Sequence, residues 1–287
     1  HKEYRRQRQM CIRDRLITGA SRGIGALIAE AALADGNAVI AAGRNVDAIA
    51  KRLGQSPALL PVALDVTDEA QAKAAVAAGL ARFGRIDVLV NNAGFGLLGA
   101  VEESSNADVR RMYDTNVFGL LNVTRAVLPT LRAQRAGHVI NLSSLGGYRS
   151  GAGFGAYCST KFAVEGLTEA LHAELKPLGI HATIVEPGYF RTDFLDATSL
   201  TVAGAIIEDY DATSGNVRRI AAGLNHQQPG DPVKLAAAML TLADAAMPPL
   251  RLPLGTDALR VIAEKNAYVA EETEAWKALA QSTDFPV

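Results

Sequence analysis

Tyr157 and Lys161 are the two side chains of this sequence with the clearest chemical potential. They lie four residues apart in the segment YCSTK, which an apolar pattern typical of an amphipathic helix follows. Residues at positions i and i+4 share one face of a helix, so the lysine ammonium would lie one turn from the phenol. A nearby positive charge favours the phenolate, so we expect the pKa of Tyr157 to be lowered from about 10. The pair therefore predicts a general acid/base.

A hydroxyl group precedes this predicted helix and strengthens the chemical interpretation, because the Tyr-Lys spacing alone also occurs on ordinary surface helices. Ser143 and Ser144 end the apolar run from His138 to Leu142, which predicts a buried strand entering a glycine-rich loop. A hydroxyl at the carboxyl end of a strand in an open α/β sheet faces the crevice that binds ligands. We expect one of these hydroxyls to lie near Tyr157.

The glycine-rich segment after the apolar pair Leu16-Ile17 predicts a phosphate-binding loop. Its glycines at Gly19, Gly23 and Gly25 precede a helix predicted at about residues 24–35. Gly19 permits a tight turn, Gly23 lets backbone approach a pyrophosphate, and Gly25 lets the helix pack closely on the strand. The unpaired N–H groups at the helix N-terminus would point at the phosphates. An isolated glycine cluster is usually an ordinary turn, but the position between strand and helix favours a cofactor loop.

These motifs, together with Asn91-Asn92-Ala93-Gly94, Asn116 and Pro187-Gly188, resemble the short-chain dehydrogenase/reductase family over about residues 16–255. Five motifs in the order and spacing of the family make the resemblance specific. It implies hydride transfer between the nicotinamide of NADP(H) and a carbonyl or secondary alcohol substrate. Two rivals on the same scaffold are a catalytically silent NADP-sensing regulatory protein and an isomerase or enoyl-type reductase.

The resemblance assigns chemical roles to four residues. Tyr157 would exchange a proton with the substrate oxygen, and Lys161 would lower its pKa and grip the nicotinamide ribose. Ser144 would hydrogen-bond the substrate oxygen, and we prefer it to Ser143 because the serine of the family precedes the tyrosine by about 13 residues. Asn116 would hold a proton-relay water through its backbone carbonyl. The expected cofactor contacts are Gly19, Ser21, Arg22, Gly23, Ile24, Gly25, Arg44, Asp65, Val66, Asn92, Ala93, Gly94, Tyr157, Lys161, Pro187, Gly188, Phe190 and Thr192.

Four of these residues, Asp65, Phe190, Thr192 and Asn116, are expected to have more specific roles. By the resemblance, Asp65 would meet the adenine edge, whereas Asp68 fits a helix N-cap better. The backbone amide near Phe190 and the hydroxyl of Thr192 would meet the nicotinamide carboxamide. Asparagine is a mediocre residue inside a helix, so Asn116 predicts a local irregularity in a helix expected from about Ala107 to Arg132.

The residues after the second predicted strand favour NADP(H), with NAD(H) as the less favoured cofactor. An NAD site needs an acidic residue about 20 residues beyond the glycine loop to bind the ribose 2′-OH. Gly43 stands at that place, with Arg44 beside it and Arg22 inside the glycine loop. Glycine leaves room for a 2′-phosphate, and a guanidinium binds phosphate bidentately. The alternative is that both arginines are ordinary solvated surface residues.

The alternation of strands and helices predicts a doubly wound parallel sheet flanked by helices, in one domain over residues 16–287. Residues 193–230 lack clear periodicity, which suits a substrate lid. The tail from Thr256 to Ala280 is predicted to be an amphipathic helix, with Trp276 packed on the body. The strands are expected at residues 16–17, 39–42, 59–64, 86–90, 139–142, 182–185 and 250–254, and the helices at 24–35, 46–53, 69–82, 107–132, from 157 onward, 232–246 and 256–280.

The N-terminal residues do not fit this fold. Residues 1–15 are basic and lack the apolar run of a secretory signal, although an arginine-rich transit peptide remains an alternative. The first strand should be buried on both faces and apolar, yet Arg13-Asp14-Arg15 precede Leu16-Ile17. Residues 9–15 resemble translated sequencing-adapter read-through joined to a truncated gene. We therefore expect residues 1–15 to be a non-native or disordered extension.

Composition excludes several classes of partner. The chain has 287 residues, 49% hydrophobic and 21% charged, with a formal net charge of -1, so neither nucleic acid nor an anionic membrane is an expected partner. Only Cys11 and Cys158 are present, which suits a reducing, cytoplasmic compartment. No metal is expected, because Cys, His and carboxylates lack metal-site spacing, and we take the five His as structural or solvated.

The expected partner is a small, apolar carbonyl or alcohol substrate, and the family resemblance implies a homodimer or homotetramer. The segment Leu252-Pro253-Leu254-Gly255 resembles the branch of 17β-hydroxysteroid and retinol dehydrogenases, which suggests a steroid-like substrate. The residues expected to line its pocket are Phe95, Leu97, Leu98, Leu145, Tyr148, Phe154 and Tyr189.

Overall fold

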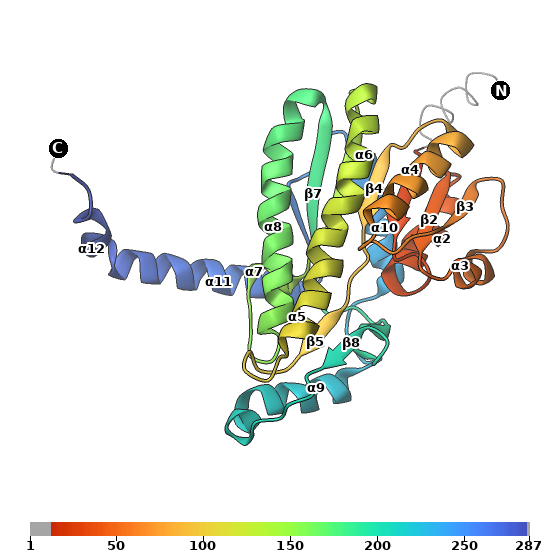
Figure 1. Cartoon of the computed structure of the whole chain (residues 1–287). Coiled ribbons are helices and arrows are strands. Elements are labelled where there is room, and N and C mark those ends of the chain that lie inside the picture. Colours follow the sequence, from red (N-terminus) through yellow and green to blue (C-terminus); the bar gives the residue numbers. More distant parts are fainter. Residues whose placement is uncertain (1–12, 286–287) are drawn as a thin grey trace.

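Seven parallel strands form the sheet around which the chain is arranged (Figure 1). In the computed structural model the described residues are 13–285. The strand order is β3-β2-β1-β4-β6-β7-β9, so the sheet is doubly wound, as the sequence predicts. The strands are β1 (Arg15–Thr18), β2 (Val39–Gly43), β3 (Leu59–Ala63), β4 (Val88–Asn91), β6 (Gly137–Leu142), β7 (Ile180–Pro187) and β9 (Arg251–Leu254).

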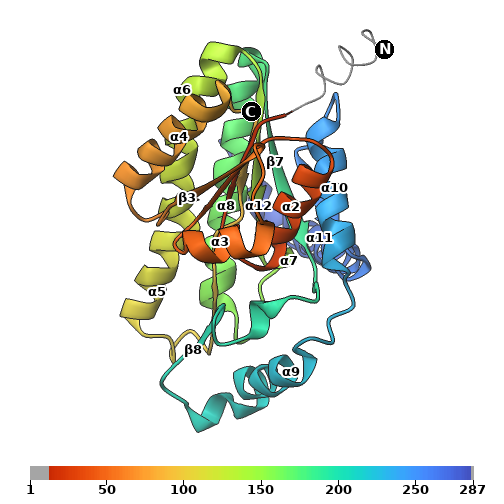
Figure 2. The same ribbon diagram turned by 90° about the vertical axis from the view of Figure 1, so that its right-hand side faces the viewer.

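Helices cover both faces of this sheet, so its central strands are buried throughout (Figure 2). One apolar core lies beneath α2 (Gly23–Ala34), α3 (Val46–Leu53) and α10 (Pro232–Asp244). The core on the opposite face lies beneath α4 (Glu69–Phe83) and α6 (Leu120–Gln134) and includes the end of α8 (Gly155–Leu175). No described helix is long and apolar enough to cross a membrane.

The strand order reverses between β1 and β4, two parallel strands that lie side by side at the centre of the sheet. The strands after β1 proceed outward on one side to β3, and those after β4 proceed outward on the other side to β9. Such a switch point leaves a crevice at the carboxyl ends of the strands, where α/β proteins bind ligands.

The helix predicted over residues 107–132 is divided into three parts. It consists of α5 (Asn106–Tyr113), a π-helical turn (Asp114–Gly119) and α6. The irregularity expected at Asn116 is therefore confirmed. The predicted cap at Asp68 is also confirmed, because its carboxylate accepts hydrogen bonds from the first backbone N–H groups of α4.

The segment 193–230 has more regular structure than the sequence predicts. It contains β8 (Leu200–Val202), which pairs in parallel with β5 (Gly96–Leu98), and α9 (Asn216–Leu224), all below the ends of the strands in Figure 1. Glu103 holds the segment in place, since it accepts hydrogen bonds from Arg218 and the backbone of Ile207. A strand of three residues is too short to show a periodic pattern, which explains the difference. Its remaining turns are Asp193–Leu195, Glu208–Tyr210 and Asp211–Gly215.

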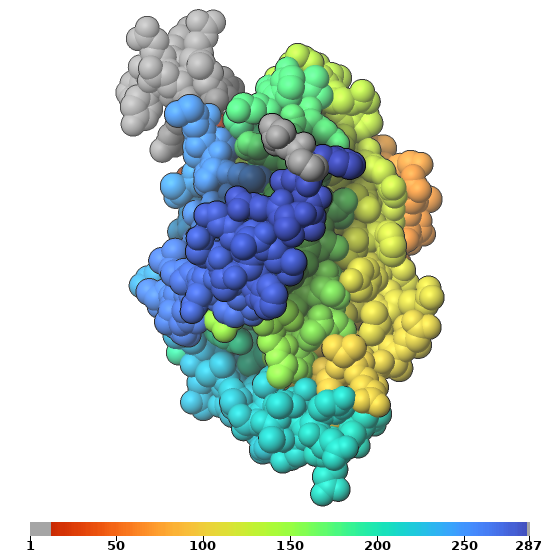
Figure 3. Space-filling view, turned by 90° about the vertical axis from the view of Figure 1, so that its left-hand side faces the viewer, coloured from red at the N-terminus to blue at the C-terminus, as the bar shows by residue number. Residues whose placement is uncertain are grey.

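The C-terminal helices extend away from the sheet. The predicted helix over 256–280 is present as α11 (Thr256–Ala275) and α12 (Lys277–Gln281), and in Figure 3 this arm stands in front of the body. The expectation that Trp276 packs on the body is wrong, because its side chain is 66% exposed at the junction of the two helices. The helix pattern carries no information about the direction in which the arm points.

The domain begins before residue 16, earlier than the sequence predicts. Arg15 is the first residue of β1 and only 1% exposed, and Asp14 is buried beside it. The Asp14 backbone joins the strand to β4, because its carbonyl accepts from the backbone N–H groups of Asp87 and Val88. Burial raises the pKa of the Asp14 carboxyl to about 6. The rest of the expected extension, residues 1–12, lies outside the described residues.

Arg15 is an unfavourable residue for a buried strand. Its guanidinium lies 3.5 Å from Asp244 Oδ1, and its Nε has no hydrogen-bond partner among the described residues. We predict that Arg15→Val raises the free energy of unfolding by about 1–4 kcal/mol, because apolar replacement of a buried charge is often stabilising. Thermal and denaturant unfolding measure the change.

Arg13→Val is the matched control. Arg13 also pairs with Asp244, at 3.2 Å, but both side chains are partly exposed, so the expected change is about 0–1 kcal/mol. A lower melting temperature for Arg15→Val would contradict the prediction and show that the buried guanidinium stabilises the fold.

Candidate active site

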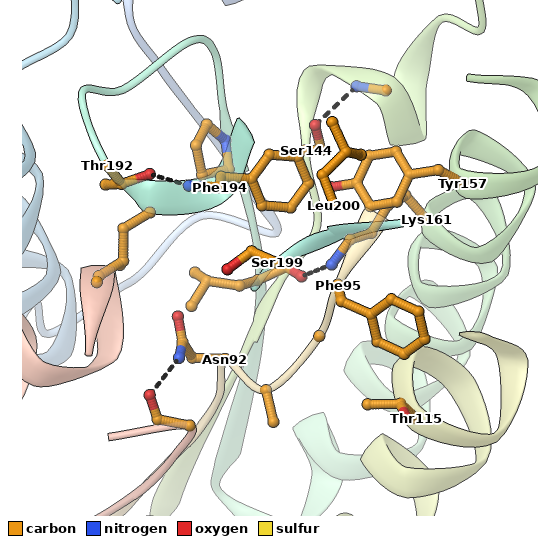
Figure 4. Close-up of a pocket in the computed structure, with 18 of the residues that line it drawn as sticks. Asn92, Phe95, Thr115, Ser144, Tyr157, Lys161, Thr192, Phe194, Ser199 and Leu200 are labelled. Atoms are coloured by element: carbon orange, nitrogen blue, oxygen red, sulfur yellow. Dashed lines mark hydrogen bonds between the residues drawn. The ribbon is translucent and has the colours of Figure 1, made fainter. Parts of the chain in front are cut away.

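A cleft of about 1600 Å³ opens at the carboxyl ends of the central strands (Figure 4). The glycine loop, the catalytic helix α8 and the segment 193–201 all contribute to its walls. In Figure 4, Tyr157, Lys161 and Ser144 lie together on one side, and Asn92 and Thr192 come from other elements around the opening. The sequence motifs that are far apart in the chain therefore meet at one place.

The glycine loop has the backbone shape that its residue types predict. Gly19 has a φ of +67° and Gly23 a φ of +56°, both in the left-handed region that favours glycine. A Cβ on Gly25 would lie 2.4 Å from the carbonyl oxygen of Gly19, which confirms that Gly25 permits close packing. A Cβ on Gly23 would meet nothing within 4 Å, so the loop is open there.

Asn92 and Thr18 fix this loop to the end of β4. The Asn92 side-chain amide donates to the carbonyl oxygen of Thr18 at 2.9 Å. The Thr18 hydroxyl accepts from the backbone N–H groups of Asn92 and Ala93, each at 3.0 Å. Asn91 donates its amide to Thr124 and Asn141, so the two adjacent asparagines stiffen the sheet at its centre.

The two arginines proposed to read a 2′-phosphate occupy different environments. Arg44 is exposed at the wall of the cleft and makes no hydrogen bond or ion pair to any other described residue. Arg22 also lines the cleft, but its guanidinium donates to the carbonyl oxygen of Thr198 and ties the glycine loop to the segment 193–201. Asp65 lines the same wall, and its carboxylate accepts from the backbone and hydroxyl of Thr67.

Tyr157 and Lys161 lie in the first half of α8, and both are buried, at 8% and 7% exposure. Lys161 Nζ donates to the carbonyl oxygen of Leu142, at the end of β6, at 2.8 Å, and lies 5.8 Å from the centre of the Tyr157 ring. Phe154 and Phe194 pack against the same ring, with centroids at 6.1 and 5.5 Å. Tyr157 and Lys161 are thus held between the sheet and two aromatic side chains.

Burial changes the protonation of both groups. Desolvation raises the pKa of Tyr157 above its usual range, although a hydrogen bond with Ser144 acts in the lowering direction. The expectation of a lowered pKa for Tyr157 is therefore wrong for this structure, because desolvation is the largest effect and the hydrogen bond with Ser144 offsets only part of it. Burial lowers the pKa of Lys161 to about 8, and Glu165 acts in the opposite direction. At neutral pH the site holds a neutral phenol beside an ammonium group.

Ser144 is the serine that lies beside the tyrosine. It caps the short helix α7 (Leu145–Tyr148), because its hydroxyl accepts from the backbone N–H of Gly146 at 3.1 Å. Ser143 Oγ is buried and lies toward Glu165, and its hydrogen bond with that carboxylate acts to lower the pKa of Glu165. The structure thus places Ser144, the preferred residue, at Tyr157.

Asn116 joins the loop after β4 to the catalytic helix. Its side-chain amide donates to the carbonyl oxygen of Phe95 at 2.9 Å and to Thr160 Oγ1 at 3.1 Å. Its side-chain oxygen accepts from the backbone N–H of Phe95. The side chain is fully engaged in positioning, and the predicted role of its backbone carbonyl stays a prediction.

The turn after β7 forms another wall of the cleft. Pro187, Gly188, Phe190 and Thr192 all line it, as do Ser21, Ile24, Val66 and Gly94 from the other motifs. Asp257 was not expected at this wall from any sequence pattern, and its carboxylate accepts from the backbone N–H of Tyr189. A Cβ on Gly188 would lie 2.1 Å from this carboxylate, so glycine is required at that position.

The predicted apolar pocket is only partly present. Phe95, Leu145, Phe154 and Tyr189 line the cleft. The other three predicted residues do not line the cleft. Leu97 and Leu98 are each buried in a smaller apolar core, and Tyr148 lines a second cavity. The side chains of Phe194, Leu200 and Val217, from the predicted lid, complete the apolar lining.

A grouping of possible metal ligands occurs in the segment 193–230, where no metal-site spacing was found in the sequence. The ligand atoms of Asp193, Asp196 and His226 lie within 4.8 Å of one another, although His226 is distant in the chain. His226 Nε2 lies 3.4 Å from Asp196 Oδ1. Exposed acidic groups of this kind are common without a metal.

The family model described as short chain dehydrogenase matches residues 15–202. The chain belongs to this family and is an oxidoreductase. It is similar to oxidoreductase BOA17 from Botryotinia fuckeliana, with 38% identity over 266 residues, which cover 92% of this chain and 96% of the relative. It is also similar to a 3-ketodihydrosphingosine reductase from Bacteroides thetaiotaomicron, with 36% identity over 241 residues, covering 84% and 87%.

Solved structures agree with this assignment. The crystal structure of a short-chain dehydrogenase from Streptomyces avermitilis has a TM-score of 0.89 and 40% identity, covering 96% of this chain and 100% of that chain. An alcohol dehydrogenase from Thermococcus sibiricus, complexed with 5-hydroxy-NADP, has a TM-score of 0.68 and 26% identity, covering 85% and 96%. The doubly wound fold that the sequence predicts is therefore confirmed.

Proposed function

We propose that this protein is an NADP(H)-dependent reductase of ketones, or dehydrogenase of the corresponding secondary alcohols. The observation that carries the proposal is the meeting of Tyr157, Ser144 and Lys161 at the wall of a cleft whose opposite wall is the glycine loop. The residues present fit a dinucleotide, because Gly25 allows close packing of the loop and Gly23 leaves it open toward the cleft.

The cofactor supplies the hydride, and the side chains of the chain itself control the proton. Tyr157 is neutral at neutral pH, so in the reducing direction its hydroxyl donates a proton to the substrate oxygen. Ser144 hydrogen-bonds that oxygen and orients it toward Tyr157. Lys161 is held by the Leu142 carbonyl, so its ammonium stabilises the phenolate that remains after the proton leaves.

The rival functions are distinguished by the site and by the bond that is reduced. A silent NADP-sensing protein would be expected to lack one of the four residues Asn116, Ser144, Tyr157 and Lys161, and all four are present. An isomerase or enoyl-type reductase would act on a carbon-carbon double bond. We favour the carbonyl, because the neutral phenol and the serine hydroxyl provide two hydrogen-bond donors for one substrate oxygen.

The apolar lining of the cleft supports a substrate with a large apolar part. Phe95, Phe154, Phe194 and Leu200 surround the approach to Tyr157. The similarity to a 3-ketodihydrosphingosine reductase favours a long-chain ketone over the steroid-like substrate that the C-terminal motif suggests. The lid role of residues 193–230, the cytoplasmic location and the homo-oligomeric state stay predictions.

Tyr157→Phe removes only the hydroxyl that donates the proton. We predict that kcat for ketone reduction falls by roughly 10²–10⁴-fold, the usual contribution of a general acid, while the Kd for NADPH changes little. Steady-state kinetics and a fluorescence titration of NADPH measure the two effects. Near-normal kcat in the folded variant would rule out Tyr157 as the proton donor.

The proposed preference for NADP(H) rests on Gly43 and Arg44. Both line the cleft beside Ser21, and Arg44 is exposed and available for a 2′-phosphate. A Cβ on Gly43 would lie 3.3 Å from Ile49 Cδ1, the flexible end of a side chain, so an aspartate fits after a small adjustment. A carboxylate there would repel a 2′-phosphate and accept from a ribose 2′-OH.

The double variant Gly43→Asp/Arg44→Leu is predicted to lower or invert the ratio of kcat/KM for NADPH to that for NADH. Arg22→Leu is the comparison variant, because Arg22 is bound to Thr198 and should change the ratio less. A parent enzyme that uses both cofactors equally, or an unchanged ratio in the double variant, would show that Arg44 does not bind the 2′-phosphate.

A further inference from the structure

Two buried carboxylates lie behind Lys161 and have no role in the proposed reaction. Glu165 follows Lys161 by one turn of α8, so the series Tyr157, Lys161, Glu165 lies along one face of that helix. Glu186 comes from the carboxyl end of β7 and is 0% exposed. The pair therefore connects α8 to the carboxyl end of β7, beside the cleft.

A single guanidinium serves both carboxylates. Arg251, on β9, places its terminal nitrogen 3.2 Å from Glu165 Oε2 and its Nε 3.3 Å from Glu186 Oε1. The same terminal nitrogen contacts Glu169, at the surface, at a shorter distance than either. One positive charge is therefore divided among three carboxylates, two of which are shielded from water.

The oxygens of the buried pair have few hydrogen-bond donors. Besides the long contacts to Arg251, the Ser143 hydroxyl acts on Glu165 and the two carboxylates act on each other, although a buried carboxylate normally accepts several short bonds. A proton carried by Glu186 and donated to Glu165 would satisfy one oxygen of each and leave one net charge opposite Arg251. Burial and the charge of Glu165 raise the pKa of Glu186 to about 7, and burial also raises the pKa of Glu165.

Other charged or titratable groups face the pair from each neighbouring element. Lys161 lies above Glu165 on α8, and Glu169 lies below it. Tyr148 on α7 stacks near both Arg251 and Lys265 of α11, whose charged groups are each 6.0 Å from its ring centre. A second cavity of about 490 Å³ is lined by Glu165, Glu169, Arg251 and Lys265, which gives the pair a route for proton exchange with solvent.

We propose that Glu165 and Glu186 share one proton and act as positioning residues for Lys161, an inference that rests on the proposed reductase function. When the pH rises, the shared proton leaves through the second cavity and the pair gains one negative charge. Glu165 transmits this charge to Lys161, whose ammonium is thereby held protonated beside Tyr157. The reductase thus keeps the ammonium that stabilises the Tyr157 phenolate at higher pH than the burial of Lys161 alone would allow.

The pH profile of kcat/KM for ketone reduction tests this role. Glu165→Gln preserves shape and removes the charge that faces Lys161, so the alkaline apparent pKa should fall by on the order of one pH unit. Glu186→Gln should lower it in the same direction by less, because Glu186 acts through Glu165. Glu169→Gln is the matched control on the same helix, and its profile should remain that of the parent, since its side chain is 52% exposed.

Thermal unfolding as a function of pH tests the shared proton without catalysis. The pKa of Glu186 is raised in the folded state, so the folded chain binds more protons than the unfolded chain between the unfolded value, about 4.3, and about 7. Stability then decreases as pH rises through that window. Glu186→Gln should reduce this decrease, whereas Asp14, whose pKa is also raised, contributes equally to parent and variant.

The outcomes separate this inference from the proposed function. A parent that reduces no ketone would overturn the proposed function, and the unfolding experiment would still decide whether the proton is shared. Folded Glu165→Gln with the pH profile of the parent would overturn the positioning role. An unchanged pH dependence of melting in Glu186→Gln would overturn the shared proton, and if that variant does not fold, Glu165→Gln provides the same comparison.

Discussion

The buried ammonium of Lys161 is the constraint on which the rest of the site depends. A lysine with 7% exposure needs a strong acceptor, and the Leu142 carbonyl at the end of β6 provides one. This bond fixes α8 against the carboxyl edge of the sheet and thereby fixes Tyr157. Asn116 adds a second attachment through Thr160, from the loop that follows β4. The position of the catalytic pair is thus determined from two neighbouring strands.

Desolvation, more than pairwise attraction, determines the protonation of the site. It raises the pKa of Tyr157 and lowers that of Lys161 to about 8, so the phenol is neutral and the lysine titrates near the physiological range. A neutral phenol suits donation of a proton to a carbonyl oxygen. It also makes the charge behind Lys161 important, and the Glu165–Glu186 pair lies there and shares one guanidinium, that of Arg251.

Local chemistry made much of the fold predictable. The apolar strands, the cap at Asp68 and the glycine loop each follow from rules that involve neighbouring residues, and Asn116 predicted a local helix irregularity, which is a π-helical turn in the structure. Tertiary contacts were not predictable in this way. Arg22 is bound by the Thr198 carbonyl, and the direction of α11 leaves Trp276 exposed. Glu165, Glu186 and Arg251 lie on three elements that only the folded sheet brings together.

The central claim is that the side chains beside Lys161 support hydride transfer to a carbonyl carbon. The most direct measurement follows deuterium from NADPH labelled at nicotinamide C4, in the transferable position, during reduction of a long-chain ketone. The account predicts one deuterium on the carbinol carbon of the alcohol product, with the hydroxyl proton supplied by Tyr157 and exchanged with solvent. Deuterium at a carbon of a reduced double bond, or a product without deuterium, would contradict it.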